Sequence, residues 1–283
     1  MGKGSKIRFA EREDEKLIND FLSSRVYIHR HLDWRSPAEW LGFQPYLVQE
    51  SPSKKIEAVL NCTPEPKDHF WIRLFACKKS INPVQTWQIV FPAAQKTAKS
   101  LSKNPKFISL AYQDWWRELL EIEGWQEIQR VIQLEWNPNS LERSPLSAHY
   151  CIRQLRRDGI GEIKQVDDAG FKSLWRQSTA AFKNAHALAD YATVYLTGGQ
   201  IIGFQICTLE GKKAHLARIA VLPKYQNIGV GKALVNDLIT HYTNQGIFDI
   251  SVNTQSDNEK SLAFYKRLGF EETEESFPIF FLD

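Results

Sequence analysis

Residues 216–238 read LARIAVLPKYQNIGVGKALVNDL, and three local structures are predicted along them. The first six residues form a short β-rich run, and the loop after them holds Gly229 and Gly231. From Lys232 onward, apolar residues recur at the spacing of one helix face. The first N–H groups of a helix lack internal partners and its dipole favours negative charge there, so this stretch predicts an anion-binding site.

The two common phosphate loops fit this stretch poorly. A P-loop requires Ser or Thr after its lysine, but Lys232 is followed by Ala233. A dinucleotide fingerprint requires a third glycine near position 234, which is Leu234. Glycines at 229 and 231 would let the backbone approach a diphosphate with no Cβ atom in the way.

The loop has a longer pattern than a glycine pair. Its sequence QNIGVG, residues 226–231, follows a Val-x-Pro and resembles the Gln/Arg-x-x-Gly-x-Gly/Ala signature of the GNAT acetyltransferases. The resemblance implies that the loop binds the pyrophosphate of acetyl-CoA and that the preceding strand pairs with its pantetheine arm. The contacts so implied are Ile219, Ala220, Val221, Gln226, Asn227, Ile228, Gly229, Val230, Gly231 and Lys232.

A second motif lies on a predicted helix from about residue 257 to 268. Asn258, Ser261 and Tyr265 share one helix face, and they resemble the family's Asn-x-x-Ala/Ser-x-x-x-Tyr followed by Gly-Phe. The resemblance implies that Asn258 and Ser261 contact pantetheine and that Tyr265 is the general acid. Taken alone, Tyr265 also fits a core residue whose hydroxyl reaches water.

His215 stands six residues before Val221, where the serotonin N-acetyltransferase branch of the family carries a catalytic histidine. The resemblance implies a general base, since a neutral imidazole accepts a proton near pH 7. Ala217 replaces that branch's second histidine. Strand alternation predicts that positions 215, 217, 219 and 221 face one way. A structural histidine bonded to a backbone carbonyl remains the alternative.

Asn253 marks a departure from the ribosomal-protein branch of the family. That branch carries a base Glu five residues before the Asn of the helix motif, and here the position is Asn253. An amide cannot serve as a base, so a protein N-terminus is a less favoured substrate. Asn253 could still hydrogen-bond the substrate or a relay water.

The chain repeats itself at an offset of 145 residues. IEAVLNC ends at Cys62 and IIGFQIC at Cys207, and HFWIRLFA and AHLARIAV place Arg73 against Arg218. We therefore predict two tandem domains, 1–143 and 148–283, joined through the Pro/Ser-rich stretch 137–147. The order of predicted strands and helices is of the α/β class with a mixed sheet, which resembles the GNAT fold.

The first copy is predicted to lack the cofactor site. At the fixed offset Val84 and Thr86 replace the two glycines, Phe70 replaces His215 and Leu120 replaces Tyr265. We expect this copy to form a wall of the acceptor cleft. Its tryptophans would supply an apolar interdomain face: Trp34, Trp40, Trp71, Trp87, Trp115 and Trp116.

Composition narrows the class of protein. A net charge of +3 over 283 residues is too small to argue for nucleic acid. No apolar run approaches a membrane span, and the four cysteines form no disulfide or zinc pattern, so we expect a cytoplasmic protein. His29-Arg30-His31 has the spacing of no standard metal site, and no metal is expected. The oligomeric state stays open.

The sequence thus predicts an acetyl-CoA-dependent N-acetyltransferase that acts on a primary amine of a small molecule or peptide. In this reading His215 deprotonates the amine, either itself or through a water molecule. The amine attacks the thioester directly, and Tyr265 protonates the thiolate. Two alternatives stay open: a non-catalytic CoA-binding regulator, and an acyl or aminoacyl transferase with another donor.

Overall fold

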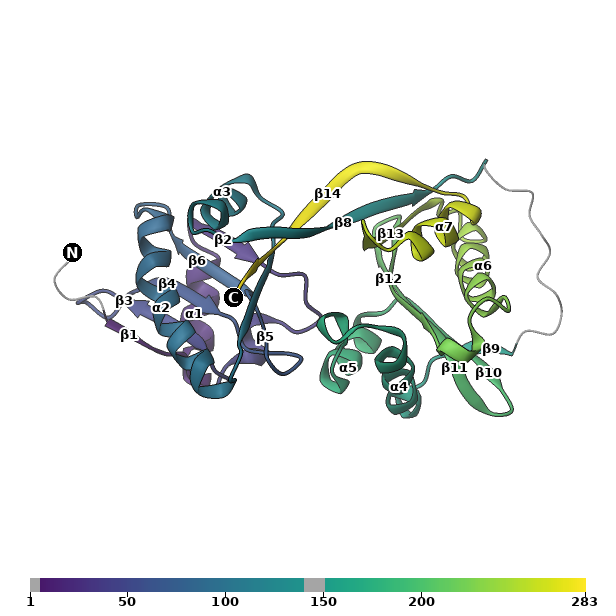
Figure 1. Cartoon of the computed structure of the whole chain (residues 1–283), viewed down its shortest axis with the longest axis horizontal. Helices are drawn as coiled ribbons and strands as arrows, with labels where there is room; N and C mark the ends of the chain where they lie inside the picture. The colour runs from purple at the N-terminus through teal and green to yellow at the C-terminus, as the bar shows by residue number, and fades with distance from the viewer. Residues whose placement is uncertain (1–5, 140–150) are drawn as a thin grey trace. The chain divides into compact units, whose positions relative to one another are not determined.

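The computed structural model describes residues 6–139 and 151–283, and the chain forms two compact units (Figure 1). The first unit comprises the described residues through Gln129 together with Phe277–Asp283, and the second is Arg130–Ser276. No helix among the described residues is both long and apolar enough to cross a membrane.

The second unit is built on one mixed sheet. Its order is β9-β10-β11-β12-β13-β8-β14, with β12 and β13 parallel and the other pairs with printed registers antiparallel. Helices α6 and α7 lie on one side of this sheet and α4 and α5 on the other (Figure 1). The elements are β9 (Ile152–Gln154), α4 (Ile160–Gly170), α5 (Thr179–Leu188), β10 (Tyr191–Thr197), β11 (Gln200–Glu210), β12 (Lys213–Val221), α6 (Val230–Thr243), β13 (Asp249–Gln255), α7 (Glu259–Arg267) and β14 (Phe270–Leu282).

The first half of the sequence follows the element order of the second half with three differences among the described residues: β2 is added, α5 has no α-helical counterpart, and the two strands β5 and β6 stand in place of β12. Strand β2 joins the sheet β1-β3-β4-β6-β2, and β5 and β7 pair in parallel. The elements are β1 (Lys6–Phe9), α1 (Glu15–Leu22), β2 (Val26–Arg30), β3 (Tyr46–Glu50), β4 (Ile56–Asn61), β5 (His69–Trp71), β6 (Leu74–Lys78), α2 (Pro83–Leu101), β7 (Lys106–Leu110), α3 (Asp114–Ile122) and β8 (Gln126–Trp136).

The internal repeat is visible in the element boundaries. Helices α3 and α7 begin and end 145 residues apart, since 259 − 114 and 267 − 122 are both 145. The buried arginines also correspond: Arg73 pairs with Asp33 and lies over the Trp40 ring, while Arg218 pairs with Asp167 and lies over the Phe171 ring. The predicted mixed α/β fold is confirmed, and both halves share it.

The two halves of the sequence exchange their last strands. The second half of β8 pairs with β13, from Val131 with Gln255 to Glu135 with Ser251, so it completes the sheet of the second unit. The end of β14 pairs with β7, from Ile279 with Leu110 to Leu282 with Phe107, so it completes the first unit. The compact units therefore divide the chain differently from the expected ranges 1–143 and 148–283. Most of the expected joint, 137–147, lies outside the described residues.

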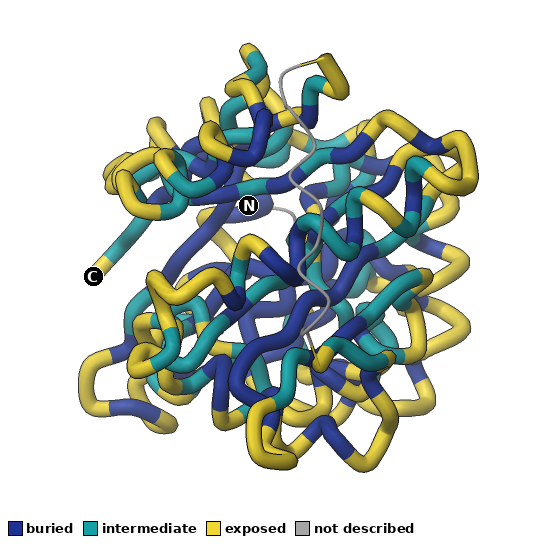
Figure 2. Tube along the Cα trace, turned by 90° about the vertical axis from the view of Figure 1, so that its right-hand side faces the viewer, coloured by how far each residue is buried: buried dark blue, intermediate teal, exposed yellow. Residues whose placement is uncertain are grey.

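The tryptophans of the first half form a core rather than a face. Trp87 and Trp116 are fully buried in an apolar cluster with Phe75 and Phe91, and Trp87 stacks on Phe91 with ring centroids 4.3 Å apart. Trp40 is buried in a second cluster of the same unit. We expected Trp40, Trp87 and Trp116 to form an interdomain surface. This expectation is wrong, because their rings are buried in the apolar clusters of the unit. Figure 2 shows the buried strands as dark blue segments.

Candidate active site

Strand β12 carries a β-bulge in the middle of the predicted site. Its register with β11 places Leu216 opposite Cys207 and Arg218 opposite Ile206, so Ala217 has no partner across the pair. Leu216 and Ile219 consequently pack on the same apolar cluster, beneath α6 and α7. The predicted alternation along 215, 217, 219 and 221 is therefore wrong, because one extra residue reverses the faces beyond it.

Beyond the bulge, β12 separates from its parallel neighbour. The β12–β13 pairing runs from Lys213 with Asp249 to Leu216 with Val252 and stops there. Strand β13 then continues beside β8, whereas residues 217–221 have no strand partner on that side within residues 6–139 and 151–283. Their backbone N–H and C=O groups form an open sheet edge, which an extended, amide-bearing ligand can join by strand addition. Ile219, Ala220 and Val221 lie on this edge.

The loop between β12 and α6 leaves the helix N-terminus free of side-chain caps. Gly229 is the N-cap residue with φ 97°, a left-handed conformation that favours glycine, and no side chain caps the helix. Gln226 donates from Nε2 to the Val221 carbonyl over 3.0 Å and so fastens the loop to the strand end. Asn227 is also left-handed, Ile228 is exposed, and Lys232 lies in the first turn after Val230. This arrangement fits an anion such as a diphosphate.

The two loop glycines serve different purposes. A Cβ atom on Gly229 would meet nothing within 4 Å, so its need for glycine is conformational. A Cβ atom on Gly231 would lie 3.3 Å from the Phe264 ring of α7, so this glycine allows α6 and α7 to pack. Gly231 thus has a helix-packing role, and the expectation that both glycines clear space for a diphosphate stays a prediction.

His215 is half-buried and its ring contacts the neighbouring strand. Its Nδ1 lies 2.9 Å from the Ser251 hydroxyl oxygen, and burial lowers the pKa of the imidazole below its usual value. The alternative of a ring bonded to a backbone carbonyl, as in His29 with the Ile72 carbonyl, is not what His215 shows.

Tyr265 lies in α7 among aromatic rings. It is 5% exposed and packs edge-on against Phe264 and Phe270. Burial raises the pKa of its hydroxyl, and the positive charge of Arg218 opposes that rise. The hydroxyl is therefore protonated at neutral pH, as a proton donor must be.

Asn258 and Ser261 begin α7 rather than sharing one face of it. Asn258 is the N-cap, and its side-chain oxygen accepts from the Ser261 backbone N–H over 3.2 Å. Asn253 lies on β13, and its buried Oδ1 has no hydrogen-bond partner in the described parts of the chain. An unpartnered buried carbonyl oxygen is costly, so Asn253 Oδ1 is an acceptor that lacks its usual partner among the described residues.

Arg218 and Ser251 are site components that sequence reasoning missed. Arg218 donates to Asp167 of α4 and to the Trp175 carbonyl, which fixes the α4–α5 segment against the sheet. An arginine within an apolar strand was a signal that it needs a buried partner. Ser251 had no such signal, because its contact with His215 depends on the register of two strands 36 residues apart.

In the first unit, the strand edge is paired and the helix N-terminus is capped, whereas both are open in the second unit. Strand β2 pairs antiparallel with β6, from Val26 with Lys78 to Arg30 with Leu74, and so occupies the edge that corresponds to residues 219–223. At the start of α2, Asn82 caps the helix through a bond from the Gln85 N–H, and Pro83 has no N–H to offer.

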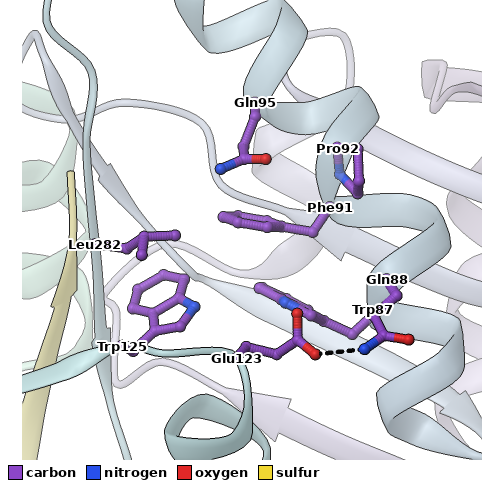
Figure 3. Close-up of a pocket in the computed structure, with 8 residues that line it drawn as sticks. All are labelled: Trp87, Gln88, Phe91, Pro92, Gln95, Glu123, Trp125 and Leu282. Carbon is purple, nitrogen blue, oxygen red and sulfur yellow. Dashed lines mark hydrogen bonds between the residues drawn. The ribbon is translucent and has the colours of Figure 1, made fainter.

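A cavity of about 250 Å³ lies elsewhere in the first unit (Figure 3). Aromatic rings of α2 and of Trp125 form its walls, and Gln88 donates to the Glu123 carboxylate over 2.8 Å at its margin. None of the sequence-predicted site residues lines it. Its lining is Trp87, Gln88, Phe91, Pro92, Gln95, Glu123, Trp125 and Leu282.

Known proteins resemble the second half of the chain in sequence. The Acetyltransferase (GNAT) family profile matches residues 146–270. The ribosomal protein bS18-alanine N-acetyltransferase of Haemophilus influenzae is 34% identical over 123 residues, which are 44% of this chain and 82% of that protein. The glucosamine 6-phosphate N-acetyltransferase of Trypanosoma brucei brucei is 37% identical over 137 residues, 46% of this chain and 85% of that protein.

Solved structures resemble the whole chain in fold. A tandem GNAT protein from the clavulanic acid biosynthesis pathway superimposes with a TM-score of 0.64 at 11% identity, over 99% of this chain and 98% of that one. A GCN5-related N-acetyltransferase from Sphaerobacter thermophilus gives 0.60 at 10% identity, over 98% and 95%. With sequence motifs, fold and relatives in agreement, the chain belongs to the Acetyltransferase (GNAT) family and is an N-acetyltransferase.

Proposed function

We propose that the second unit transfers acetyl from acetyl-CoA to a primary amine of a small molecule or peptide. One observation carries the proposal: the open edge of β12, residues 217–221, continues through the loop 222–229 to the N-terminus of α6, which no described side chain caps. An extended arm with amide groups can pair along the edge, and a diphosphate can lie on the helix start. Acetyl-CoA has both parts, joined in that order.

Two side chains are suited to handle the acceptor amine. Because burial lowers the pKa of His215, its ring is neutral at pH 7 and can take the proton that the amine loses. Asn253 Oδ1, two residues along β13 from Ser251 and on the same strand face, can hold a second N–H of the amine. A primary amine has hydrogens for both acceptors.

Tyr265 is suited to handle the leaving group. Acetyl-CoA supplies the acetyl group as a thioester, whose C–S bond breaks after the amine has attacked the carbonyl carbon. The Tyr265 hydroxyl, kept protonated by burial, gives its proton to the thiolate. A proton thus leaves the amine to His215 and another reaches sulfur from Tyr265, and solvent restores both residues. Backbone N–H groups near Val221 would stabilise the oxyanion.

The pairing of β2 with β6 supports one acetyl-CoA per chain. The strand edge that acetyl-CoA would need in the first unit is already hydrogen-bonded by the protein itself. Cys62, Cys77 and Cys207 are buried free thiols, which suits a reducing compartment, and we propose the cytoplasm. The proposed chemistry needs no metal.

The test is an acceptor screen that follows free-thiol release from acetyl-CoA, with calorimetry for acetyl-CoA binding. The panel should include amino sugars, polyamines and peptides with free N-termini. Tyr265→Phe is the matched variant: we expect kcat to fall about 10- to 1000-fold with acetyl-CoA affinity nearly unchanged. Tight acetyl-CoA binding without turnover of any amine would indicate a non-catalytic binder, and weak binding would indicate another donor.

A further inference from the structure

His215 and Ser251 are brought side by side by the parallel pairing of β12 and β13. They are Cα partners in the register, and Nδ1 of the ring lies 2.9 Å from the serine oxygen. At the offset of 145 residues His215 corresponds to Phe70, whose register partner in the first unit is Phe107. The polar pair therefore occurs in the unit with the open edge, where a base would act.

The serine hydroxyl has a second neighbour that decides its orientation. Ser251 Oγ lies 3.4 Å from the Ala214 carbonyl oxygen, which can only accept. A hydroxyl that donates to this carbonyl presents its lone pairs to the ring, so Nδ1 must carry the hydrogen. The other nitrogen, Nε2, then holds a free lone pair, and no described residue bonds to it.

We propose that Ser251 is a positioning residue that holds His215 as the Nδ1–H tautomer, so that Nε2 is the atom that accepts the amine's proton. This inference rests on the proposed function, in which His215 is the base. The partner of one ring nitrogen sets the role of the other. When the amine N–H bond breaks, its proton binds Nε2, while the Nδ1–H bond to Ser251 stays in place.

The tautomer can be measured in the full-length protein without any turnover. Labelling histidine with ¹⁵N and comparing spectra with those of His215→Gln identifies the two ring nitrogens of His215 by NMR. At pH 7.5 we expect a protonated Nδ1 and an unprotonated Nε2. In Ser251→Ala the form with hydrogen on Nε2 should gain population, and Ser251→Thr, which keeps the hydroxyl, should restore the original spectrum. Hydrogen on Nε2 in the unaltered protein would overturn the inference.

Steady-state kinetics provide a second test of the role of Ser251. For an amine found in the acceptor screen, Ser251→Ala should lower kcat about fivefold, as loss of one ordinary hydrogen bond does, with acetyl-CoA affinity unchanged in calorimetry. Ser251→Thr should recover most of that loss. Full activity of Ser251→Ala would overturn the positioning role. If the unaltered protein acetylates no amine, the proposed function fails, whereas the NMR spectra still decide the tautomer.

Discussion

At the scale of one residue, burial shifts the pKa of His215, the base that we propose. Half-buried between β12 and β13, the ring has its pKa lowered, because loss of water disfavours the charged form. The neutral, proton-accepting form therefore persists to a pH below the usual histidine value of about 6.5. Above that value the ring is neutral and further alkali does not change it.

His215→Ala should lose activity most at neutral pH. We expect the rate ratio of the unaltered protein to the variant to be largest between about pH 6.5 and 8 and to fall toward pH 9.5, where free amine is abundant. On the acid side the ratio should fall only below pH 6.5, because burial lowers the pKa of His215 in the folded protein. A ratio that stays flat from pH 6.5 to 9.5 would remove His215 from the role of base.

At the scale of elements, the contact between Gly231 and Phe264 lets helices α6 and α7 pack closely. Gly231 of α6 faces the Phe264 ring of α7, and an added Cβ would lie 3.3 Å from that ring and 3.8 Å from Val221 Cγ2. The helix that follows the loop 226–229 is thereby packed against the helix that carries Tyr265. Small residues at such crossings permit close approach, and larger ones force the elements apart.

Gly231→Val should therefore destabilise this unit as well as weaken acetyl-CoA binding. We expect an overpacking cost of about 1–3 kcal/mol in the free energy of unfolding and at least tenfold weaker binding. Adding Phe264→Leu should recover part of the stability by removing the ring. Gly229→Ala is the control for conformation, since its Cβ meets nothing within 4 Å but its φ of 97° strains alanine. Unchanged stability and affinity in Gly231→Val would refute this account of the contact.

Strand β2 covers a strand edge in the first unit, and we propose that it thereby limits strand addition by a ligand to the second unit. In the first unit it forms five register pairs with β6, whereas the corresponding edge of β12 is open in the second. Calorimetry should accordingly give one acetyl-CoA per chain. The competing result, two equivalent sites, would mean that β2 leaves its edge to admit the ligand.

At the scale of the whole molecule, the exchange of strands means that the two halves of the sequence do not coincide with the two compact units. A fragment of residues 148–283 would lack β8, so β13 would lose its antiparallel partner from Ser251 to Gln255. It would also carry Ile279–Leu282, whose partner β7 is in the first half. Unpaired strands of this kind promote aggregation.

We expect the 148–283 fragment to be poorly folded and a 130–276 fragment to fold and bind acetyl-CoA. Circular dichroism, urea unfolding and calorimetry on the two fragments and the full chain make the comparison. A 148–283 fragment with cooperative unfolding and full acetyl-CoA affinity would show that β8 is dispensable to the second unit.

Features that depend on neighbouring residues could be predicted from the sequence. The glycine pattern of 226–231 and the helix after it follow from local spacing, and the repeat follows from comparing local patterns 145 residues apart. The family and the repeated α/β fold were therefore predictable and are confirmed. Backbone conformation at a glycine and periodicity along a helix are decided within a few residues.

Contacts between distant strands could not be predicted in this way. The bulge at Ala217 reversed the faces of β12, the register placed Ser251 beside His215, and β8 and β14 changed units. The sequence by itself determined the elements, their repeat and the loop chemistry. Only the tertiary structure decided which strand edge stays open, because strand partners are chosen by pairing energies across the whole sheet and leave no trace in local spacing.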